Sequence, residues 1–258
     1  MYNDDEYISP PGASDCFIEK PDGTTDEAME IALFKEHRFA FFYWYKWWKL
    51  KNTGSKPALV SIDWHQDLCE PVECEKEELD RLDLASFKEV VKFSWEKLNP
   101  LNDGHILAAA YLGFIGDIYV LCKQDIESKF TEFVGRDGEV HKIHCFYDKE
   151  ELMRSLRDNE ISELYLDIDL DYFTESSDPC GGGDDLTVMD TSQIQSVIDP
   201  QSEVMLWCFK RLQGMTLATE PEFCGGVRNS NYIFDTIDRS LFSAPLMGTQ
   251  ATWRHLIA

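Results

Sequence analysis

The sequence predicts an α/β protein, a three-layer α/β/α sandwich built on a mostly parallel sheet. Short apolar runs typical of buried strands alternate along the chain with longer segments whose apolar residues recur at helical spacing. Strands separated by helices form parallel sheets that are covered on both faces. The chain has 258 residues, 43% of them hydrophobic, which is enough to bury such a core. We therefore predict one domain over residues 1–258, with an irregular segment at 1–23.

The elements can be assigned in order from residue 24. Thr24 and Thr25, followed by acidic residues, are typical of a helix start and predict one long aromatic helix, or two helices, over residues 24–50. Strands are expected where apolar runs are short and bounded by polar residues. The further expected strands span residues 57–63, 117–123, 139–146, 162–173 and 215–221, and the further expected helices span 75–99, 104–115, 148–158, 191–213 and 231–242.

Charge and cysteine content restrict the functions to be considered. The formal net charge of −24 is expected to repel nucleic acid and anionic membranes and to attract cationic ligands, although a need for solubility would account for it equally well. No apolar stretch approaches the roughly 20 residues that span a bilayer, and the acidic start lacks the pattern of a signal peptide. The eight cysteines show no zinc-ribbon spacing. We expect a soluble protein of the reducing cytoplasm.

Polar residues stand at the ends of three expected strands, where parallel sheets place their sites. They are Asp63, His65 and Asp67 in "VSIDWHQDL", Asp167, Asp169 and Asp171 in "LYLDIDLDYF", and Glu220 and Glu222 in "ATEPEF".

Alternate residues of an extended segment share a face, so several carboxylates are expected to gather at one buried edge. They cannot all remain ionised there unless cations lie between them, and a bound divalent metal is the simplest relief. Carboxylates with one or two imidazoles suit Mn²⁺ or a similar ion. An acidic loop after a strand is the plain alternative for the first motif alone, and the second motif weakens it.

The two motifs resemble those of the ureohydrolases, the family of arginase and agmatinase. "SIDWHQDL" is similar to their Asp-Ala-His-x-Asp motif, and "LYLDIDLDYF" is similar to their Ser-x-Asp-x-Asp-x-x-Asp-Pro motif. The forms "IDWHQDL" and "LDIDLDYF" resemble more closely the UPF0489 family, an arginase-like branch that includes peptide arginases. The resemblance spans residues 37–226 and implies an arginase/deacetylase-like fold with two Mn²⁺ ions per chain.

The resemblance also implies roles for individual residues. Asp63 and Asp167 would bridge the two metals. His37, which stands 26 residues before Asp63, corresponds to an earlier histidine ligand of the ureohydrolases, although its surroundings depart from their Gly-Gly-Asp-His and a helix histidine is the alternative. The implied metal ligands are His37, Asp63, His65, Asp67, Asp167 and Asp169. The register of the second motif is open, because Asp169 and Asp171 could instead be the metal pair; we favour Asp167 and Asp169, with Asp171 as a supporting residue or a cap.

The implied catalytic residues are Asp67, His105 and Glu222. Asp67 and His105 would transfer protons to the leaving nitrogen, and Glu222, with Glu220 as the alternative, would bind the guanidinium. Without such roles, His105 is simply a histidine after a turn, and the Glu-Pro-Glu segment is a solvated turn. The Gly-rich segment 176–187 falls where agmatinase-like enzymes have a pocket loop, and a simple flexible loop is the alternative. The expected substrate is an arginine-containing peptide or a small guanidino compound.

Three other functions remain to be weighed. An amide deacetylase on the same fold would use one metal, and Asp67 argues for two. A phosphohydrolase using Asp-x-Asp would have Thr or Val where Asp171 stands. A metal-binding protein without turnover is compatible with the sequence, and no sustained heptad pattern indicates an oligomer.

Overall fold

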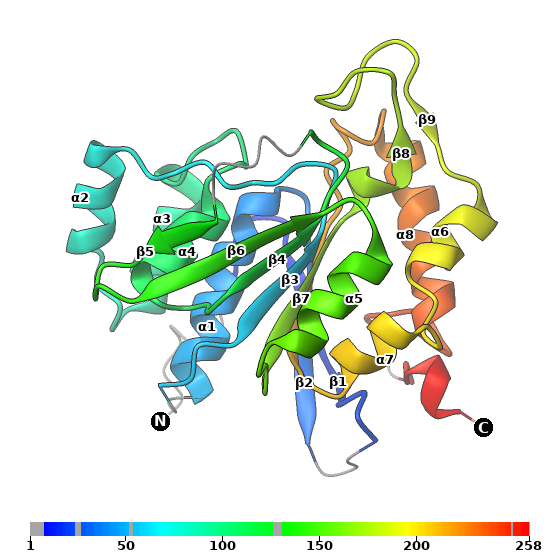
Figure 1. Cartoon of the computed structure of the whole chain (residues 1–258), viewed down its shortest axis with the longest axis horizontal. Helices are drawn as coiled ribbons and strands as arrows, with labels where there is room; N and C mark the ends of the chain where they lie inside the picture. Colours follow the sequence, from blue (N-terminus) through cyan, green and yellow to red (C-terminus); the bar gives the residue numbers. More distant parts are fainter. Residues whose placement is uncertain (1–7, 24–26, 52–53, 126–130, 249, 258) are drawn as a thin grey trace.

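The described residues form a mixed, mostly parallel sheet of eight strands (Figure 1). The computed structural model describes residues 8–23, 27–51, 54–125, 131–248 and 250–257. In spatial order the strands are β1 (Ser14–Glu19), β2 (Ala28–Phe34), β10 (Leu212–Ala218), β7 (Leu164–Asp169), β3 (Ala58–Ile62), β4 (Ile118–Leu121), β6 (Val140–Phe146) and β5 (Glu132–Val134). The six inner strands are parallel, and β1 and β5 close the two edges in antiparallel pairing.

Helices cover both faces of this sheet, which confirms the predicted α/β class (Figure 1). Two buried apolar clusters lie on its two sides. One cluster includes residues of α1 (Ala40–Lys51), α2 (Glu73–Arg81), α3 (Phe87–Glu96) and α4 (His105–Leu112). The other includes residues of α5 (Lys149–Asp158), α6 (Thr191–Val197), α7 (Glu203–Phe209) and α8 (Val227–Leu241). The described residues also form short 3-10 helices, η2 (His37–Phe39), η3 (Leu170–Phe173) and η4 (Arg254–Leu256). A small hairpin is formed by β8 (Thr174–Glu175) and β9 (Thr187–Val188).

The N-terminal part of the prediction is wrong in two places. Residues 28–34, expected to be helical, form strand β2, and residues 14–19, expected to be irregular, form β1. Ala, Met, Glu and Leu favour helices locally, but β2 gains a strand partner on each side, and such tertiary pairing overrides local preference. Its inward Glu30 is satisfied by Lys46 and by the indole of Trp47 at 2.7 Å. Residues 1–7 and the expected cap residues Thr24 and Thr25 lie outside the described residues.

Most other elements follow the prediction, with two long helices each divided. The short strands β5, β8 and β9 were not predicted, β10 begins at Leu212 inside the expected helix 191–213, and residues 170–173, expected as strand, form η3. The segment 75–99 contains α2 and α3, and Ser86 starts α3 by accepting a hydrogen bond from the Glu89 amide. The segment 191–213 contains α6 and α7, and Ser202 caps α7 in the same way. These divisions occur because a hydroxyl that bonds the amide three residues on begins a new helix.

Gly214 is required where β10 meets α1. A Cβ atom at this position would lie 2.4 Å from the Trp47 ring, which is closer than carbon atoms can pack. We expect Gly214→Ala to lower the free energy of unfolding by about 1–3 kcal/mol, measured by urea denaturation. Gly104→Ala is the control, because its Cβ would meet neighbours only at 3.5 Å. A Gly214→Ala variant as stable as the control would contradict this packing.

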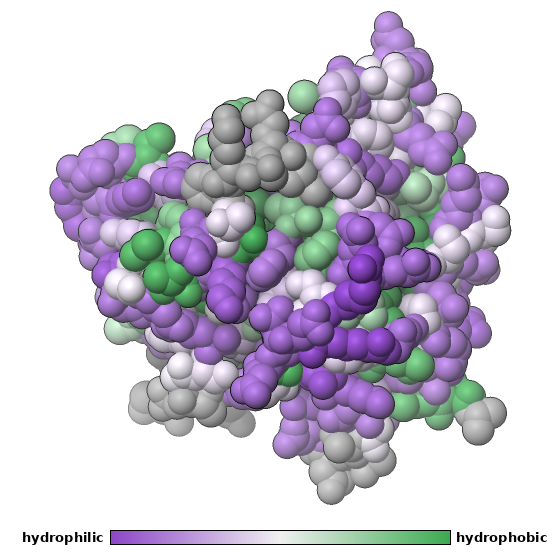
Figure 2. Space-filling view, viewed as in Figure 1, coloured by the Kyte–Doolittle hydropathy of each residue, from purple (hydrophilic) through white to green (hydrophobic). Residues whose placement is uncertain are grey.

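Hydrophilic residues dominate the face of the molecule in Figure 2, where hydrophobic residues form smaller patches. This distribution agrees with the excess of acidic over basic residues in the sequence. Within the described ranges, no helix combines the length and the apolar character needed to cross a bilayer.

Candidate metal centre

The predicted site residues meet at the carboxyl ends of four neighbouring parallel strands. His37 follows β2, Asp63 follows β3, Asp169 ends β7, and Glu220 comes two residues after β10. These strands lie side by side in the order β2, β10, β7, β3, so their ends point to the same edge of the sheet. This edge is where parallel sheets place their binding sites.

The clustered side chains form four groups with the spacing of metal ligands. Two of them share one carboxylate: the first contains His37, Asp63 and Asp67, and the second contains Asp63, His65 and Asp171. The other two are His37, His105 and Asp167, and Asp169, Asp171 and Glu220. Within each group the candidate ligand atoms all lie within 4.8 Å of one another. Asp63 belongs to both of the groups that share a carboxylate, so it could contribute to holding each of two metals.

In both histidines Nε2 is held by an oxygen acceptor and Nδ1 faces carboxylates of the shared groups. His37 Nε2 lies 2.8 Å from Asp167 Oδ2, and His65 Nε2 lies 2.8 Å from the carbonyl oxygen of Cys180. A carboxylate or carbonyl accepts, so each Nε2 donates its proton, and each Nδ1 would offer a lone pair to a metal that displaces the proton favoured by the surrounding carboxylates. His37 Nδ1 is 3.0–3.3 Å from carboxylate oxygens of Asp63, Asp67 and Asp169. This arrangement, in which the second nitrogen is fixed by an acceptor, is typical of metal-binding histidines.

Asp167 is held as a support for His37 instead of facing the cluster. Its Oδ2 accepts from Ser61 Oγ at 2.8 Å as well as from His37, and its Oδ1 accepts from Thr216 Oγ1 at 2.6 Å. The sheet register places Ser61 and Thr216 directly beside it on the two neighbouring strands. Both oxygens of the carboxylate are therefore already occupied.

Asp169 and Asp171 face the cluster in its place. Asp169 Oδ2 lies 3.1 Å from His37 Nδ1, and Asp171 Oδ2 lies 3.1 Å from His65 Nδ1. The structure therefore favours the alternative register, with Asp169 and Asp171 as the metal pair, over the register with Asp167 and Asp169. The cap that we expected from Asp171 is supplied by Asp169, whose Oδ1 accepts from the Asp171 amide.

Electrostatics divide the carboxylates of the cluster. Burial alone would raise the pKa of Asp63 and Asp167, but His37 lowers both, helped by His65 at Asp63, whereas four other carboxylates lack enough compensating charge. Burial raises the pKa of Asp67, Asp169, Asp171 and Glu220, and neighbouring carboxylates raise each of them further. Burial opposes protonation of His65, but Asp171 and Asp63 raise its pKa to about 12. Protons are thus retained where charge must be balanced, and metal ions bound by the same atoms would release them.

Unpartnered buried atoms provide the test of whether a metal fits. Among the described residues, His37 Nδ1, Asp63 Oδ2 and Asp171 Oδ2 are buried and have no hydrogen-bond partner. Buried polar atoms normally have partners, so atoms left without one call for a specific explanation. All three residues belong to the two groups that share Asp63, and imidazole and carboxylate donors without thiolates suit Mn²⁺. The residues present therefore fit a pair of divalent cations.

Two of the predicted catalytic residues are placed differently from the prediction. Glu222 is exposed and pairs with Lys35 outside the cluster, whereas the alternative, Glu220, is buried within it. Glu220 Oε1 accepts from the His37 amide at 2.9 Å and from Asn102 Nδ2 at 2.5 Å.

His105 is fully buried behind His37, with the two ring centroids 4.3 Å apart. Its Nδ1 donates to the carbonyl oxygen of Asn102 at 2.9 Å, and burial together with His37 lowers its pKa to about 3. His105, which we expected to transfer protons, therefore places neither of its ring nitrogens at the pocket. Asp67 is the nearer candidate, because its side chain lines the pocket and its Oδ2 lies 3.8 Å from His105 Nδ1.

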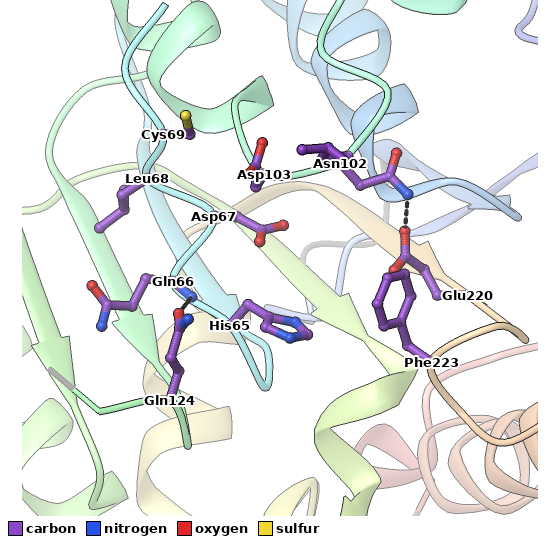
Figure 3. A pocket seen from close by; sticks show the side chains of 11 residues that line it. His65, Gln66, Asp67, Leu68, Cys69, Asn102, Asp103, Gln124, Glu220 and Phe223 are labelled. Carbon is purple, nitrogen blue, oxygen red and sulfur yellow. Dashed lines mark hydrogen bonds between the residues drawn. The ribbon is translucent and has the colours of Figure 1, made fainter. Parts of the chain in front are cut away.

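A pocket of about 350 Å³ opens beside the cluster (Figure 3). In Figure 3, His65 and Asp67 point across it toward Glu220 and Phe223. The carboxylates that line it are Asp67, Asp103 and Glu220, and none of its described lining residues is Lys or Arg. The segment 176–187, expected at the pocket, contacts His65 through Cys180 instead of lining this space. The pocket is therefore suited to a cationic group.

Asn102, Ser61 and Thr216 were not identified as site residues from the sequence. Ser61 lies within the first motif, and only the strand register shows that its hydroxyl faces Asp167. Asn102 belongs to a turn in which its φ is 62°, a conformation that asparagine tolerates better than most residues. For Asn102, the available signal in the sequence was a polar turn residue three positions before His105.

The register of the second motif can be tested by two substitutions. We expect Asp171→Asn to remove one of two bound Mn²⁺ ions. We expect Asp167→Asn to keep both with about 10- to 100-fold weaker affinity at one site, because it disturbs only the support of His37. Equilibrium dialysis with metal analysis measures both. Loss of a metal in Asp167→Asn with both retained in Asp171→Asn would restore the other register.

Comparison with solved structures finds similarity to an arginase. The fold aligns with the crystal structure of Helicobacter pylori arginase over 81% of this chain and 72% of that chain, with 14% sequence identity and a TM-score of 0.44. No protein-family model matches the chain, and no curated protein matches it. The metal centre described above rests on the geometry of this chain's own residues.

Proposed function

We propose that the protein is a binuclear metal-dependent hydrolase of the ureohydrolase type that cleaves a guanidinium group. The observation that carries the proposal is the pair of ligand groups sharing Asp63, whose members include three buried atoms without a hydrogen-bond partner. An isolated acidic turn would leave its carboxylates in water and would not lock two imidazoles in one tautomer. A site for two metals argues for hydrolysis over simple structural ligation, because two adjacent cations can act on both sides of a reacting bond.

The acidic pocket supports a cationic substrate. Its carboxylates surround a space that adjoins both ligand groups, and Glu220 lies where a bound guanidinium could donate to its carboxylate. A carboxylate and a guanidinium form strong, oriented hydrogen bonds because both groups are planar and charged. The hydrogen bonds from His37 and Asn102 both reach Oε1, which holds this oxygen of the Glu220 carboxylate in place.

The chain's own residues account for binding, orientation and proton transfer. Two divalent cations held by His37, Asp63, His65, Asp67, Asp169 and Asp171 would supply positive charge that lowers the pKa of a water molecule. Asp67, whose pKa is raised by burial and by Asp63, lines the pocket and can receive and return a proton there. Glu220 orients the cation, and Phe223 with exposed Leu101 forms an apolar rim at the pocket.

We propose in addition that the metal is Mn²⁺ and that the substrate is arginine within a peptide, converted to ornithine with release of urea, as in the arginase-like UPF0489 branch. The absence of Lys and Arg from the described pocket lining supports this choice, because a free amino acid would bring a carboxylate that needs a cation. The cytoplasm is the proposed compartment, since all eight cysteines are free thiols in the structure.

The test is metal content and urea release measured on the same preparation. We expect about two Mn²⁺ per chain and urea from an arginine-containing peptide, with less from free arginine. The Asp63→Ala variant is the control for metal-dependent turnover. A wild-type protein that binds no divalent metal would refute the proposal, and two metals without urea from either substrate would restrict it to metal binding.

A further inference from the structure

Lys123 occupies an unusual place beside the metal centre. It follows the end of β4, the strand next to β3, and its Nζ lies 4.9 Å from the ring centre of Trp64 and 4.9 Å from that of Tyr172. The ammonium also donates to the carbonyl oxygen of Thr174 at 2.6 Å. Burial lowers its pKa to about 8, so the charged form still predominates at pH 7.

The two rings belong to the segments that carry one of the ligand groups. Trp64 stands between Asp63 and His65, and Tyr172 directly follows Asp171. The two segments are joined by a hydrogen bond of 3.1 Å from the Trp64 amide to Asp171 Oδ1. The amide of Lys123 itself donates to the Trp64 carbonyl oxygen at 3.0 Å. Lys123 thus contacts Trp64 through both its backbone and its side chain.

The contact to Thr174 extends this connection to the far side of Asp171. Thr174 Oγ1 donates to the carbonyl oxygen of Asp171 at 2.8 Å, and Thr174 O accepts from Lys123. Cation–π contacts strengthen when the cation is removed from water, and both rings are at least nine-tenths buried. The Lys123 ammonium therefore contacts residues that neighbour Asp63, His65 and Asp171 in the chain, without contacting these three candidate ligands themselves.

We propose that Lys123 is a positioning residue for the group formed by Asp63, His65 and Asp171, and that it acts through the rings of Trp64 and Tyr172. The inference rests on the metal-binding part of the proposed function and not on the substrate. Loss of the cation frees the Trp64 and Tyr172 rings to move apart, so the geometry of this group relaxes. The group formed by His37, Asp63 and Asp67 keeps its support from Asp167 and is affected less.

The test is calorimetric titration of Mn²⁺ into metal-free protein, which resolves two sites. Lys123→Met keeps the length of the side chain and removes its charge, and Lys123→Gln keeps a donor for Thr174 O but not the charge. We expect both to weaken one site about tenfold or more and to change the other less than threefold. Lys123→Arg, which retains the cation, is expected to restore affinity to within threefold of wild type. Lys97→Met, which removes an exposed ammonium paired with Glu78, is the control.

A second step assigns the weakened site. In an Asp171→Asn background, which leaves one site, Lys123→Met is expected to have no further effect on the remaining affinity. Unchanged affinities in both charge-removing variants would overturn the inference, as would equal weakening of both sites with a fall in Tm. A wild-type chain that binds no Mn²⁺ would instead refute the proposed function, whereas two sites that are indifferent to Lys123 would refute this inference alone.

Discussion

Replacing Asp63 with alanine is expected to abolish measurable Mn²⁺ binding at both sites. Asp63 is the member shared by the two ligand groups, and its Oδ2 is buried without a hydrogen-bond partner among the described residues. Its Oδ1 accepts from the His65 amide at 2.7 Å, which restrains the carboxylate. A single truncation therefore removes a donor from each metal and the anion that lies between them.

The loss has two measurable consequences. Dialysis and metal analysis should find fewer than about 0.2 equivalents in Asp63→Ala at micromolar Mn²⁺, against two in wild type, because loss of a ligand shared by both sites weakens each by several kcal/mol. Ligand binding raises Tm only in proteins that bind, so Mn²⁺ should stabilise the wild type and leave Asp63→Ala unchanged.

Asp235→Ala is the matched control, since it removes an exposed aspartate that pairs with Arg239. It should bind two metals as the wild type does. Retention of one full equivalent in Asp63→Ala would show that the two groups are independent and that Asp63 does not bridge them.

The general plan of the fold could be predicted because apolar runs and their polar ends are local features. β3, β4, β7 and β10 are short buried runs, and the charged residues directly after three of them form the cluster. β2 could not be predicted, because its residues favour a helix and become a strand only through pairing with β1 and β10. Local sequence carries no information about that pairing.

The same reason bears on the register of the second motif. We favoured Asp167 and Asp169 as the metal pair because the apolar run ends directly at Asp167, inside the strand expected over residues 162–173, and β7 continues through Asp169. A carboxylate can lie within a buried strand only if neighbours satisfy it, and those neighbours, Ser61 and Thr216, come from β3 and β10. The facing of Asp167 is thus decided by residues far away in the sequence.

Glu220 and Glu222 could not be separated in the sequence for a related reason. They flank Pro221 after β10, and either could follow a strand into a site. The structure gives Glu220 a φ of 24° and holds it with the His37 amide and Asn102, while Glu222 reaches Lys35 in solvent. An unfavourable backbone angle held by hydrogen bonds is a feature found often at functional sites.

The Glu220→Gln substitution is therefore expected to lower kcat/KM for a guanidino substrate by about 100- to 1000-fold, as removal of a buried charge from an ion pair costs roughly 3–4 kcal/mol. Gln keeps the size of the side chain and can still accept through its carbonyl oxygen, so the change tests the charge.

Glu220 also lies near Asp169 and Asp171, and a role as a metal ligand would appear as lost Mn²⁺. Retention of two metals with reduced kcat/KM assigns Glu220 to the substrate. Glu222→Gln should leave kcat/KM unchanged, and an equal loss in both variants would show that overall negative charge, and not the buried carboxylate, selects the substrate.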